Sequence, residues 1–196
     1  MGYNIANDMK GFVLIPKKLG ELNTKNRYID IAVYFVIRSY YCNGKAAIGY
    51  KKIQEKLGIS NRDIIKAIND LKEEKLLTYK YVKSDNNDYV FNEYTFNKDY
   101  DRHFEMVGSS LINQNLKAKQ IGLLIYLKLN SISGWYYYND YTDLASKLGC
   151  TRQTASKTIK DLEAFIRPSK AGGIQFINKI FTFKETAEKP QYIITL

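Results

Sequence analysis

Long apolar stretches occur twice in the chain and predict its two most deeply buried helices. The segments YIDIAVYFVIRSYY and IGLLIYLKL leave little polar face, so each should be buried on more than one side. We expect the helices that contain them to span roughly residues 25–42 and 115–131. Each is followed by a short piece that we expect to be extended, KAAIG at 45–49 and WYYY at 135–138.

A pattern of helix, turn and helix comes next in both places. Short helices at about 50–57 and 140–148 stop before a glycine that can end a helix in the left-handed conformation. Two residues later, a hydroxyl side chain precedes a longer amphipathic helix and is suited to cap it. The glycines are Gly58 and Gly149, and the capping residues are Ser60 and Thr151.

Residues that favour strands follow the second helix of each pattern. In the first half, LTYKYV, SDNND and YVFNEYTF (77–96) predict strand, turn and strand, which form a β-hairpin. In the second half, GGIQFINKIFTF, KETAEKP and QYIITL (172–196) predict the same arrangement.

These elements recur because the chain contains an internal repeat. Residues 53–71 align without a gap on 144–162, at a shift of 91, and seven of the nineteen positions are identical. The link at 97–103 is short and has no Gly or Pro, which argues against a long flexible tether. The repeat therefore predicts two domains, at 1–97 and 98–196. The identical pairs are Lys56/Lys147, Leu57/Leu148, Gly58/Gly149, Lys66/Lys157, Ile68/Ile159, Asp70/Asp161 and Leu71/Leu162.

Each copy resembles a winged helix-turn-helix domain, as found in MarR- and GntR-type bacterial regulators. The resemblance implies an α+β fold, mainly α, with two tandem domains of this kind. Two winged helices in one chain also resemble the architecture of plasmid and phage replication initiators and of small accessory proteins of conjugation. The second copy departs from the pattern at FIRP (165–168), and its last helix should end before Pro168. The residues that carry the resemblance are Leu57-Gly58-Ile59-Ser60 with Ile64, Ile68, Leu71 and KLL (75–77), and Leu148-Gly149-Cys150-Thr151 with Ala155, Ile159 and Leu162.

The two apolar helices are expected to pack together and make the chain an internal pseudo-dimer. The second helices of the two patterns would then enter successive major grooves about 34 Å apart, as in an ordinary dimer. Alternatively, each apolar helix is the core of its own domain, or one of them builds a homodimer interface. We therefore expect either a monomer with an internal pseudo-dimer or a homodimer.

Composition and charge narrow the choice of partner. The 196 residues are 45% hydrophobic, with a net charge of +10 and a pI of about 9.4. This charge favours an anionic partner, although a solvated basic surface would have the same composition. The longest apolar run, IAVYFVI at 31–37, is far short of the ~20 residues of a membrane span. Without a signal-peptide pattern and with only Cys42 and Cys150, we expect a cytoplasmic protein with reduced thiols and no membrane partner.

The second helix of each pattern has one apolar face, and its other face is available to DNA. In a helix-turn-helix, this helix lies in the major groove, where Arg pairs with guanine and Asn or Gln with adenine. Lysines at equivalent positions are expected to contact phosphates. Because Asp63 is acidic and Ile65 is apolar, we expect the first copy to contact DNA bases less well than the second. The candidate DNA-contacting residues are Asn61, Arg62, Ile65, Lys66 and Asn69 in the first copy, and Arg152, Gln153, Thr154, Ser156, Lys157 and Lys160 in the second.

The hairpins supply weaker candidates, which would meet phosphates or the minor groove. They are Lys80, Lys83, Asn86 and Asn87 in the first hairpin, and Lys184 and Lys189 in the second.

No catalytic or cofactor motif stands out in the sequence. The only histidine is His103, and there is no phosphate-binding loop of the Walker type. We therefore expect a non-enzymatic protein without cofactor that binds double-stranded DNA sequence-specifically. Its role would lie in transcription regulation or at a replication or transfer origin of a mobile element, alongside that machinery. The alternative is a winged-helix module for protein–protein interaction, of the helicase-loader or chromosome-structure type.

Overall fold

The computed structural model describes residues 11–83, 90–100, 103–169 and 173–177, which form a mixed α+β fold. The first half contains β1 (Phe12–Pro16), η1 (Lys17–Glu21), α1 (Arg27–Ser39), β2 (Tyr41–Cys42), β3 (Lys45–Ile48), α2 (Tyr50–Leu57), α3 (Asn61–Glu73), β4 (Leu77–Lys83) and β5 (Val90–Phe96). The second half contains η2 (Lys98–Tyr100), β6 (Phe104–Gly108), η3 (Ser109–Asn113), α4 (Ala118–Leu129), β7 (Trp135–Tyr137), α5 (Tyr141–Leu148), α6 (Arg152–Asp161), β8 (Ile166–Ser169) and β9 (Gly173–Phe176).

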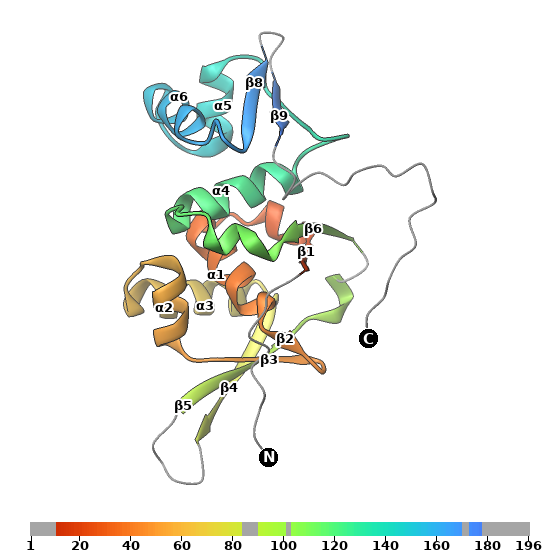
Figure 1. The fold of residues 1–196 in the computed structure, drawn as a ribbon, viewed down its shortest axis with the longest axis vertical. Helices are drawn as coiled ribbons and strands as arrows, with labels where there is room; N and C mark the ends of the chain where they lie inside the picture. Colours follow the sequence, from red (N-terminus) through yellow and green to blue (C-terminus); the bar gives the residue numbers. More distant parts are fainter. Residues whose placement is uncertain (1–10, 84–89, 101–102, 170–172, 178–196) are drawn as a thin grey trace.

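The two halves repeat one order of elements. In each, a strand and a 3-10 helix lead into an apolar helix, which is followed by short strands (β2 and β3 in the first half, β7 in the second), two helices and a hairpin. The hairpin strands pair with the short strand, in the order β2-β3-β5-β4 in the first half and β7-β9-β8 in the second. Figure 1 shows α1 and α4 stacked at the centre, with α2 and α3 on one side of this pair and α5 and α6 on the other.

The strands β1 and β6 join the two halves in a two-stranded antiparallel sheet that the sequence did not reveal. The amide of Lys17 donates to the carbonyl of His103 at 2.8 Å, and the amide of Ser109 donates to that of Gly11 at 3.0 Å. Each bond is the image of the other at an offset of 92 residues, from 17 to 109 and from 11 to 103. The same offset relates β1 to β6 and η1 to η3, and it is one residue more than the shift of 91 that relates α2 to α5 and the start of α3 to that of α6. Leu14 lies opposite Met106, its own equivalent at this offset. The two strands therefore pair about a local two-fold axis.

The helices α1 and α4 pack directly against each other, as expected from their apolar sequences. Their closest approach is at Gly122, where an added Cβ atom would lie 1.7 Å from the backbone oxygen of Tyr28. From Ile31 to Ile37 and from Ile121 to Leu127, every side chain is buried. The core is thus continuous across the two halves. The expected domain boundary at residues 97 and 98 falls between β5 and β6 and stays a prediction.

In the second half, the hairpin that the structure describes lies earlier in the chain than the sequence pattern indicated, and the expected place of GIQF in the first strand was wrong. Its strands are β8 and β9, and GIQF (173–176) forms the second strand rather than the first. The rest of the expected hairpin, at 178–196, lies outside the described residues. From the sequence, Pro168 was expected only to follow the end of a helix. Because β8 is an edge strand, it accepts this proline without loss of an inner hydrogen bond. Lys184 and Lys189, which were assigned to that hairpin, lie outside the described residues.

Candidate nucleic-acid interface

The turns that precede α3 and α6 have the same geometry. Gly58 and Gly149 adopt left-handed conformations with φ of 62° and 66°, which a glycine takes without steric cost. The Ser60 hydroxyl accepts a hydrogen bond from the amide of Asp63 at 3.2 Å, and the Thr151 hydroxyl accepts one from Thr154 at the same distance. Both helices are therefore capped as the sequence predicted, and both begin at a fixed point.

One face of each helix is buried, and the other carries the candidate residues. Ile64, Ile68 and Leu71 anchor α3, and Ala155 and Ile159 anchor α6. The opposite faces are exposed at every candidate position, namely Asn61, Arg62, Ile65, Lys66 and Asn69 in α3, and Arg152, Gln153, Thr154, Ser156, Lys157 and Lys160 in α6. Exposure leaves these side chains available to a partner, and their contacts with DNA stay predictions.

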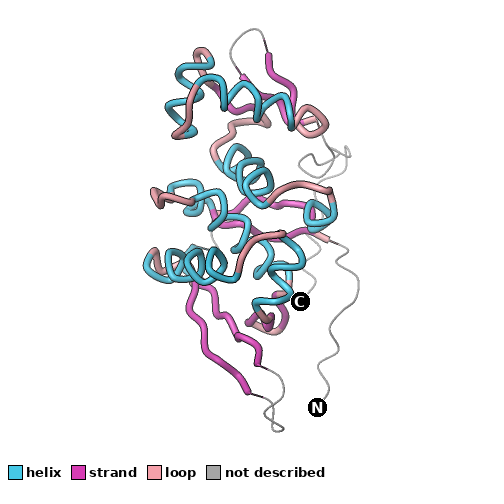
Figure 2. The backbone as a smooth tube through the Cα atoms, turned by 90° about the vertical axis from the view of Figure 1, so that its left-hand side faces the viewer, coloured by secondary structure: helices cyan, strands magenta, loops and turns pink. Residues whose placement is uncertain are grey.

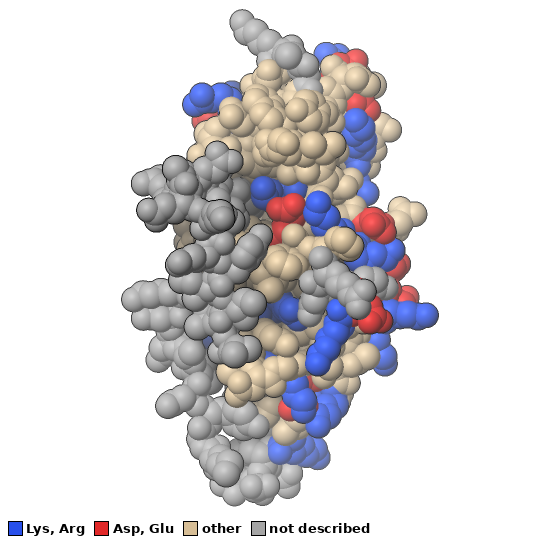
Figure 3. Space-filling view, turned by 90° about the vertical axis from the view of Figure 1, so that its right-hand side faces the viewer, with Lys and Arg blue, Asp and Glu red and all other residues tan. Residues whose placement is uncertain are grey.

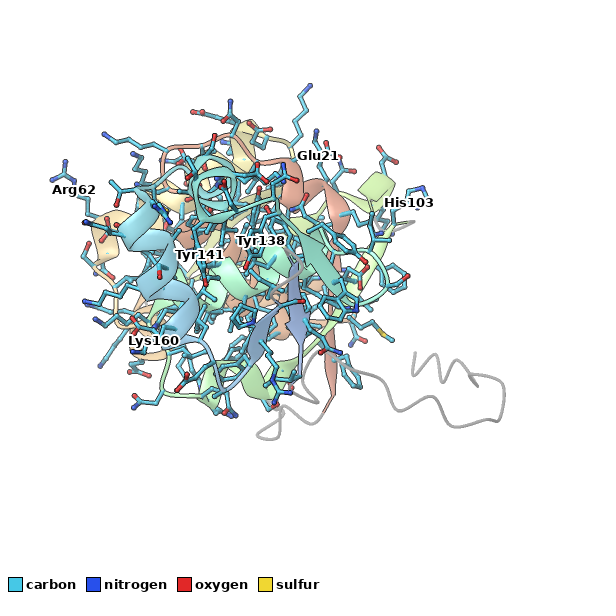
Figure 4. The ribbon with its side chains drawn as sticks, turned by 90° about the horizontal axis from the view of Figure 1, so that it is seen from above. Glu21, Arg62, His103, Tyr138, Tyr141 and Lys160 are labelled. Atoms are coloured by element: carbon cyan, nitrogen blue, oxygen red, sulfur yellow. The ribbon has the colours of Figure 1, made fainter. Side chains whose placement is uncertain are left out.

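The exposed faces of α3 and α6 lie on the same side of the molecule. Figure 4 shows the side chains of Arg62 and Lys160 pointing outward on one side, while His103 and Glu21 lie on the other. Figure 2, which views that side, shows the helix pairs of both halves toward the reader. The β1–β6 sheet lies on the opposite side of α1 and α4, at the right in Figure 1. The exposed faces of α3 and α6 are thus open to the same side of the molecule.

The charges on the two helices differ. Between Arg152 and Lys160, the exposed residues of α6 include three cations and no acid. In α3, Asp63 adds a negative charge near the first turn, and its carboxylate accepts a hydrogen bond from the Ser60 hydroxyl at 2.7 Å. Figure 3 shows the opposite face of the molecule, where acidic side chains lie among the basic ones. Over the equivalent positions 61–69 and 152–160, α6 is thus the more basic helix, and an acid follows in both, Asp70 in α3 and the exposed Asp161 in α6.

The candidate residues of the first hairpin are partly engaged within it. The ammonium of Lys80 lies 3.1 Å from Glu93, which also pairs with Lys45 at 2.9 Å. The hydrogen bond from Lys45 is the main reason that the pKa of the Glu93 carboxyl is lowered. Lys83 is exposed at the end of β4, whereas Asn86 and Asn87 lie outside the described residues. Lys80 is therefore a weaker candidate for a phosphate contact than its sequence position indicated.

Arg27 and Tyr28, at the start of α1, hold the helix-turn-helix of the other half in place. The Arg27 guanidinium donates to the backbone oxygen of Lys147 at 2.7 Å, and the Tyr28 hydroxyl donates to that of Leu148 at 3.0 Å. Arg27 also lies 4.8 Å from the centre of the Tyr126 ring on α4. Burial raises the pKa of Tyr28 to about 12, so its hydroxyl keeps its proton and remains a donor. These contacts orient α5, and through the turn they orient α6.

Replacing Arg27 with alanine should loosen this attachment. The change removes a charged hydrogen bond and a cation–π contact, which together stabilise a protein by about 2–3 kcal/mol. We expect a lower urea midpoint and faster hydrogen exchange in α5 and α6 than in α3. Arg38→Ala is not a suitable control because Arg38 is buried. Arg167→Ala, at an exposed position of β8, is the matched control and should leave both measurements unchanged. Equal acceleration of exchange in α3 would contradict the assignment.

A buried carboxyl lies behind α3. Asp30 of α1 has no exposed surface, and it accepts a hydrogen bond from the Thr24 hydroxyl. Its other oxygen has no hydrogen-bond partner. Burial raises the pKa of this carboxyl from 3.8 to about 7, and the Asp70 carboxylate of α3 adds to the rise, whereas Thr24 and Lys66 oppose it. Asp30 is therefore largely protonated below neutral pH and becomes charged above it.

The Asp30→Asn variant should remove a pH dependence of stability. Because the folded pKa is above the unfolded one, ionisation opposes folding. The stability associated with protonated Asp30 is complete below about pH 4 and is lost as pH rises through about 7. The full difference is at most about 4 kcal/mol. We expect the variant to be more stable than the wild type in urea unfolding at pH 8, with the difference smaller at pH 5. A difference that is constant between these pH values would contradict the raised pKa.

Other kinds of site find no support in the described residues. No group of three or more His, Cys, Asp or Glu side chains is placed there to hold a metal ion, and no helix among them is long and apolar enough to cross a membrane. Asp140 caps α5 by accepting hydrogen bonds from the amides of Thr142 and Asp143, at 2.6 and 2.9 Å. Cys42 and Cys150 are both free. No protein-family model, curated protein or solved structure matches the chain.

Proposed function

We propose that the protein binds double-stranded DNA sequence-specifically through α3 and α6, as two winged helix-turn-helix units packed into an internal pseudo-dimer. The observation that carries the proposal is that both helices are capped and anchored alike and expose polar faces on one side of the molecule. An anchored helix that projects amides and cations is suited to the major groove. The order of helix, strand, two helices and hairpin in each half supports the same assignment.

Each helix offers side chains that are able to contact bases and side chains that are able to contact phosphates. Arg152 and Gln153 in α6, and Asn61 and Arg62 in α3, are able to pair bidentately with guanine or adenine. Lys66 and Lys157 occupy equivalent positions and are suited to contact phosphates, which position the protein without specifying a sequence. The net charge of +10 favours association with the DNA backbone.

We further propose that the protein acts without catalysis, in transcription regulation or at an origin of replication or transfer on a mobile element. A second candidate function is a protein-interaction module. It is favoured by one observation on α3, where the apolar Ile65 is 42% exposed beside the acidic Asp63. The face of α6, which has no acidic residue between Arg152 and Lys160, favours DNA.

Binding to a random-sequence duplex at several salt concentrations tests the proposal. If Lys66, Lys157 and Lys160 meet phosphates, log affinity should fall with log salt with a slope of about −3 or steeper. Fluorescence anisotropy with a labelled duplex of about 30 base pairs measures this slope, and single-stranded DNA of the same length is the comparison. A slope near zero, or no binding at low salt, would favour the protein-interaction module.

A further inference from the structure

We infer that the DNA target is an inverted repeat whose two half-sites differ, rather than a direct repeat or a perfect palindrome. This inference rests on the proposed DNA binding and adds the orientation and the inequality of the half-sites. The orientation follows from the backbone of β1 and β6, and the inequality follows from the side chains of α3 and α6.

The pairing of β1 with β6 establishes how the two halves are related where they meet. Copies related by translation would place equivalent strands in the same direction. The observed strands are antiparallel, and Leu14 lies opposite its own equivalent, Met106. Two hydrogen bonds flank this pair, from Lys17 to His103 and from Ser109 to Gly11. If each residue is replaced by its equivalent 92 positions away, the first bond becomes the second. The relation is therefore a rotation by about 180°, and its axis passes between Leu14 and Met106.

The placement of α3 and α6 agrees with this axis. The helices α1 and α4 lie between the β1–β6 sheet and the side where Arg62 and Lys160 project, so an axis that runs from the middle of this sheet through the helix pair points to that side. In Figure 4, both side chains project on the left of the view, with Arg62 above and Lys160 below. Helices related by a two-fold axis perpendicular to DNA read the two strands in opposite directions. The half-sites are then inverted, as they are for symmetric dimers.

The side chains at equivalent positions make the half-sites unequal. The first helical position is Asn61 in α3 but Arg152 in α6, and the second is Arg62 but Gln153. In α3, a side chain suited to adenine (Asn61) is therefore followed by one suited to guanine (Arg62). In α6 the order is reversed, because Arg152 precedes Gln153. Further along, Ile65 suits a thymine methyl group, whereas the equivalent Ser156 accepts several bases.

The half-site bound by α3 should also be the weaker one. Asp63 carries a negative charge toward the DNA at the position where α6 has Thr154. The Ser60 hydroxyl fixes the Asp63 carboxylate at the first turn, so it cannot swing away from a nearby phosphate without losing that bond. Asn69 likewise replaces the cation Lys160. The target should therefore consist of one strongly and one weakly specified half-site.

Selection of duplexes from a random pool, with the wild type and with a transplanted variant, tests the inference. The variant carries Asn61→Arg, Arg62→Gln, Asp63→Thr, Ile65→Ser and Asn69→Lys, so that α3 presents the face of α6. All five positions are exposed, and urea unfolding confirms that the variant is folded. The wild type should select two different half-sites on opposite strands, with centres about 10 base pairs or a multiple of that apart. The variant should select a palindrome built from the stronger half-site.

Synthetic duplexes with the selected half-sites inverted or direct provide a second test with the wild type alone. We expect at least about tenfold tighter binding to the inverted arrangement, a difference of about 1.4 kcal/mol. Half-sites on the same strand in the selected pool, or equal affinity for the direct arrangement, would overturn the inference while leaving DNA binding intact. If neither protein enriches any duplex and binding shows no salt dependence, the proposed function itself fails.

Discussion

The Gly122→Ala variant should be strongly destabilised, although alanine is the better helix former. In an ordinary helix interior, this change stabilises a protein by about 0.5–1 kcal/mol. At Gly122, the new Cβ atom would lie 1.7 Å from the backbone oxygen of Tyr28, which cannot rotate away as a side chain can. The helices α1 and α4 must therefore separate, and a well-packed core loses contacts along its length. Overpacking typically costs about 1–3 kcal/mol, and the clash with a backbone atom places this variant at the upper end of that range.

Thermal and urea unfolding measure this effect, and we expect the melting temperature to fall by about 10 °C. The matched control is Lys119→Ala, an exposed position on the same helix, which should change stability by less than about 0.5 kcal/mol. Because the α1–α4 contact also sets the relative position of α3 and α6, the variant should lose more affinity for the selected duplex than for a single half-site. A Gly122→Ala protein as stable as the wild type would show that the two helices are not in contact.

Removing two cations from α6 should reduce affinity for the selected duplex by about 100-fold. The variant Arg152→Ala with Lys157→Ala loses a base contact, worth about 1–3 kcal/mol, and a phosphate contact. The corresponding change in α3, Arg62→Ala with Lys66→Ala, should have a smaller effect if, as we propose, that helix specifies the weaker half-site. All four side chains are exposed, so the free energy of unfolding should stay within about 0.5 kcal/mol of the wild type.

The control must remove the same charge from another part of the surface. Lys17→Ala with Lys18→Ala does so on η1, which contains Glu21 and lies away from Arg62 and Lys160. Their ion pairs with Glu105 and Glu21 are at the surface and contribute about 0–1 kcal/mol to stability. If this control lowered affinity as much as the α6 variant, binding would depend on overall charge rather than on the helix.

Local sequence signals predicted the elements that carry the candidate interface. A glycine and a hydroxyl residue two positions later are sufficient to specify the turn and the cap before α3, and the same pair recurs before α6. The apolar spacing at Ile64, Ile68 and Leu71 then determined which face of α3 is exposed. The turn, the cap and the exposed face each depend on residues within one or two helical turns, so a single sequence is enough to predict them.

Contacts between distant residues were not predictable in this way. Arg27 and Lys147 are 120 residues apart, and neither shows a local pattern that pairs it with the other. The strands β1 and β6 have five residues each. Among the described residues they pair with each other and with no other strand, and this pairing joins segments about 90 positions apart. The second hairpin was misplaced because a long run of strand-forming residues follows Pro168, and no local signal shows that pairing begins before it.

Hydroxyl-radical footprinting of the selected duplex tests the central claim, that α3 and α6 bind one DNA molecule together, most directly. The wild type should protect two patches on one face of the duplex, with centres about one helical turn or a multiple of it apart. The variant with Arg152→Ala and Lys157→Ala should lose protection at the stronger half-site and retain part of it at the other. Protection of a single patch by the wild type, or a footprint that this variant leaves unchanged, would contradict the account.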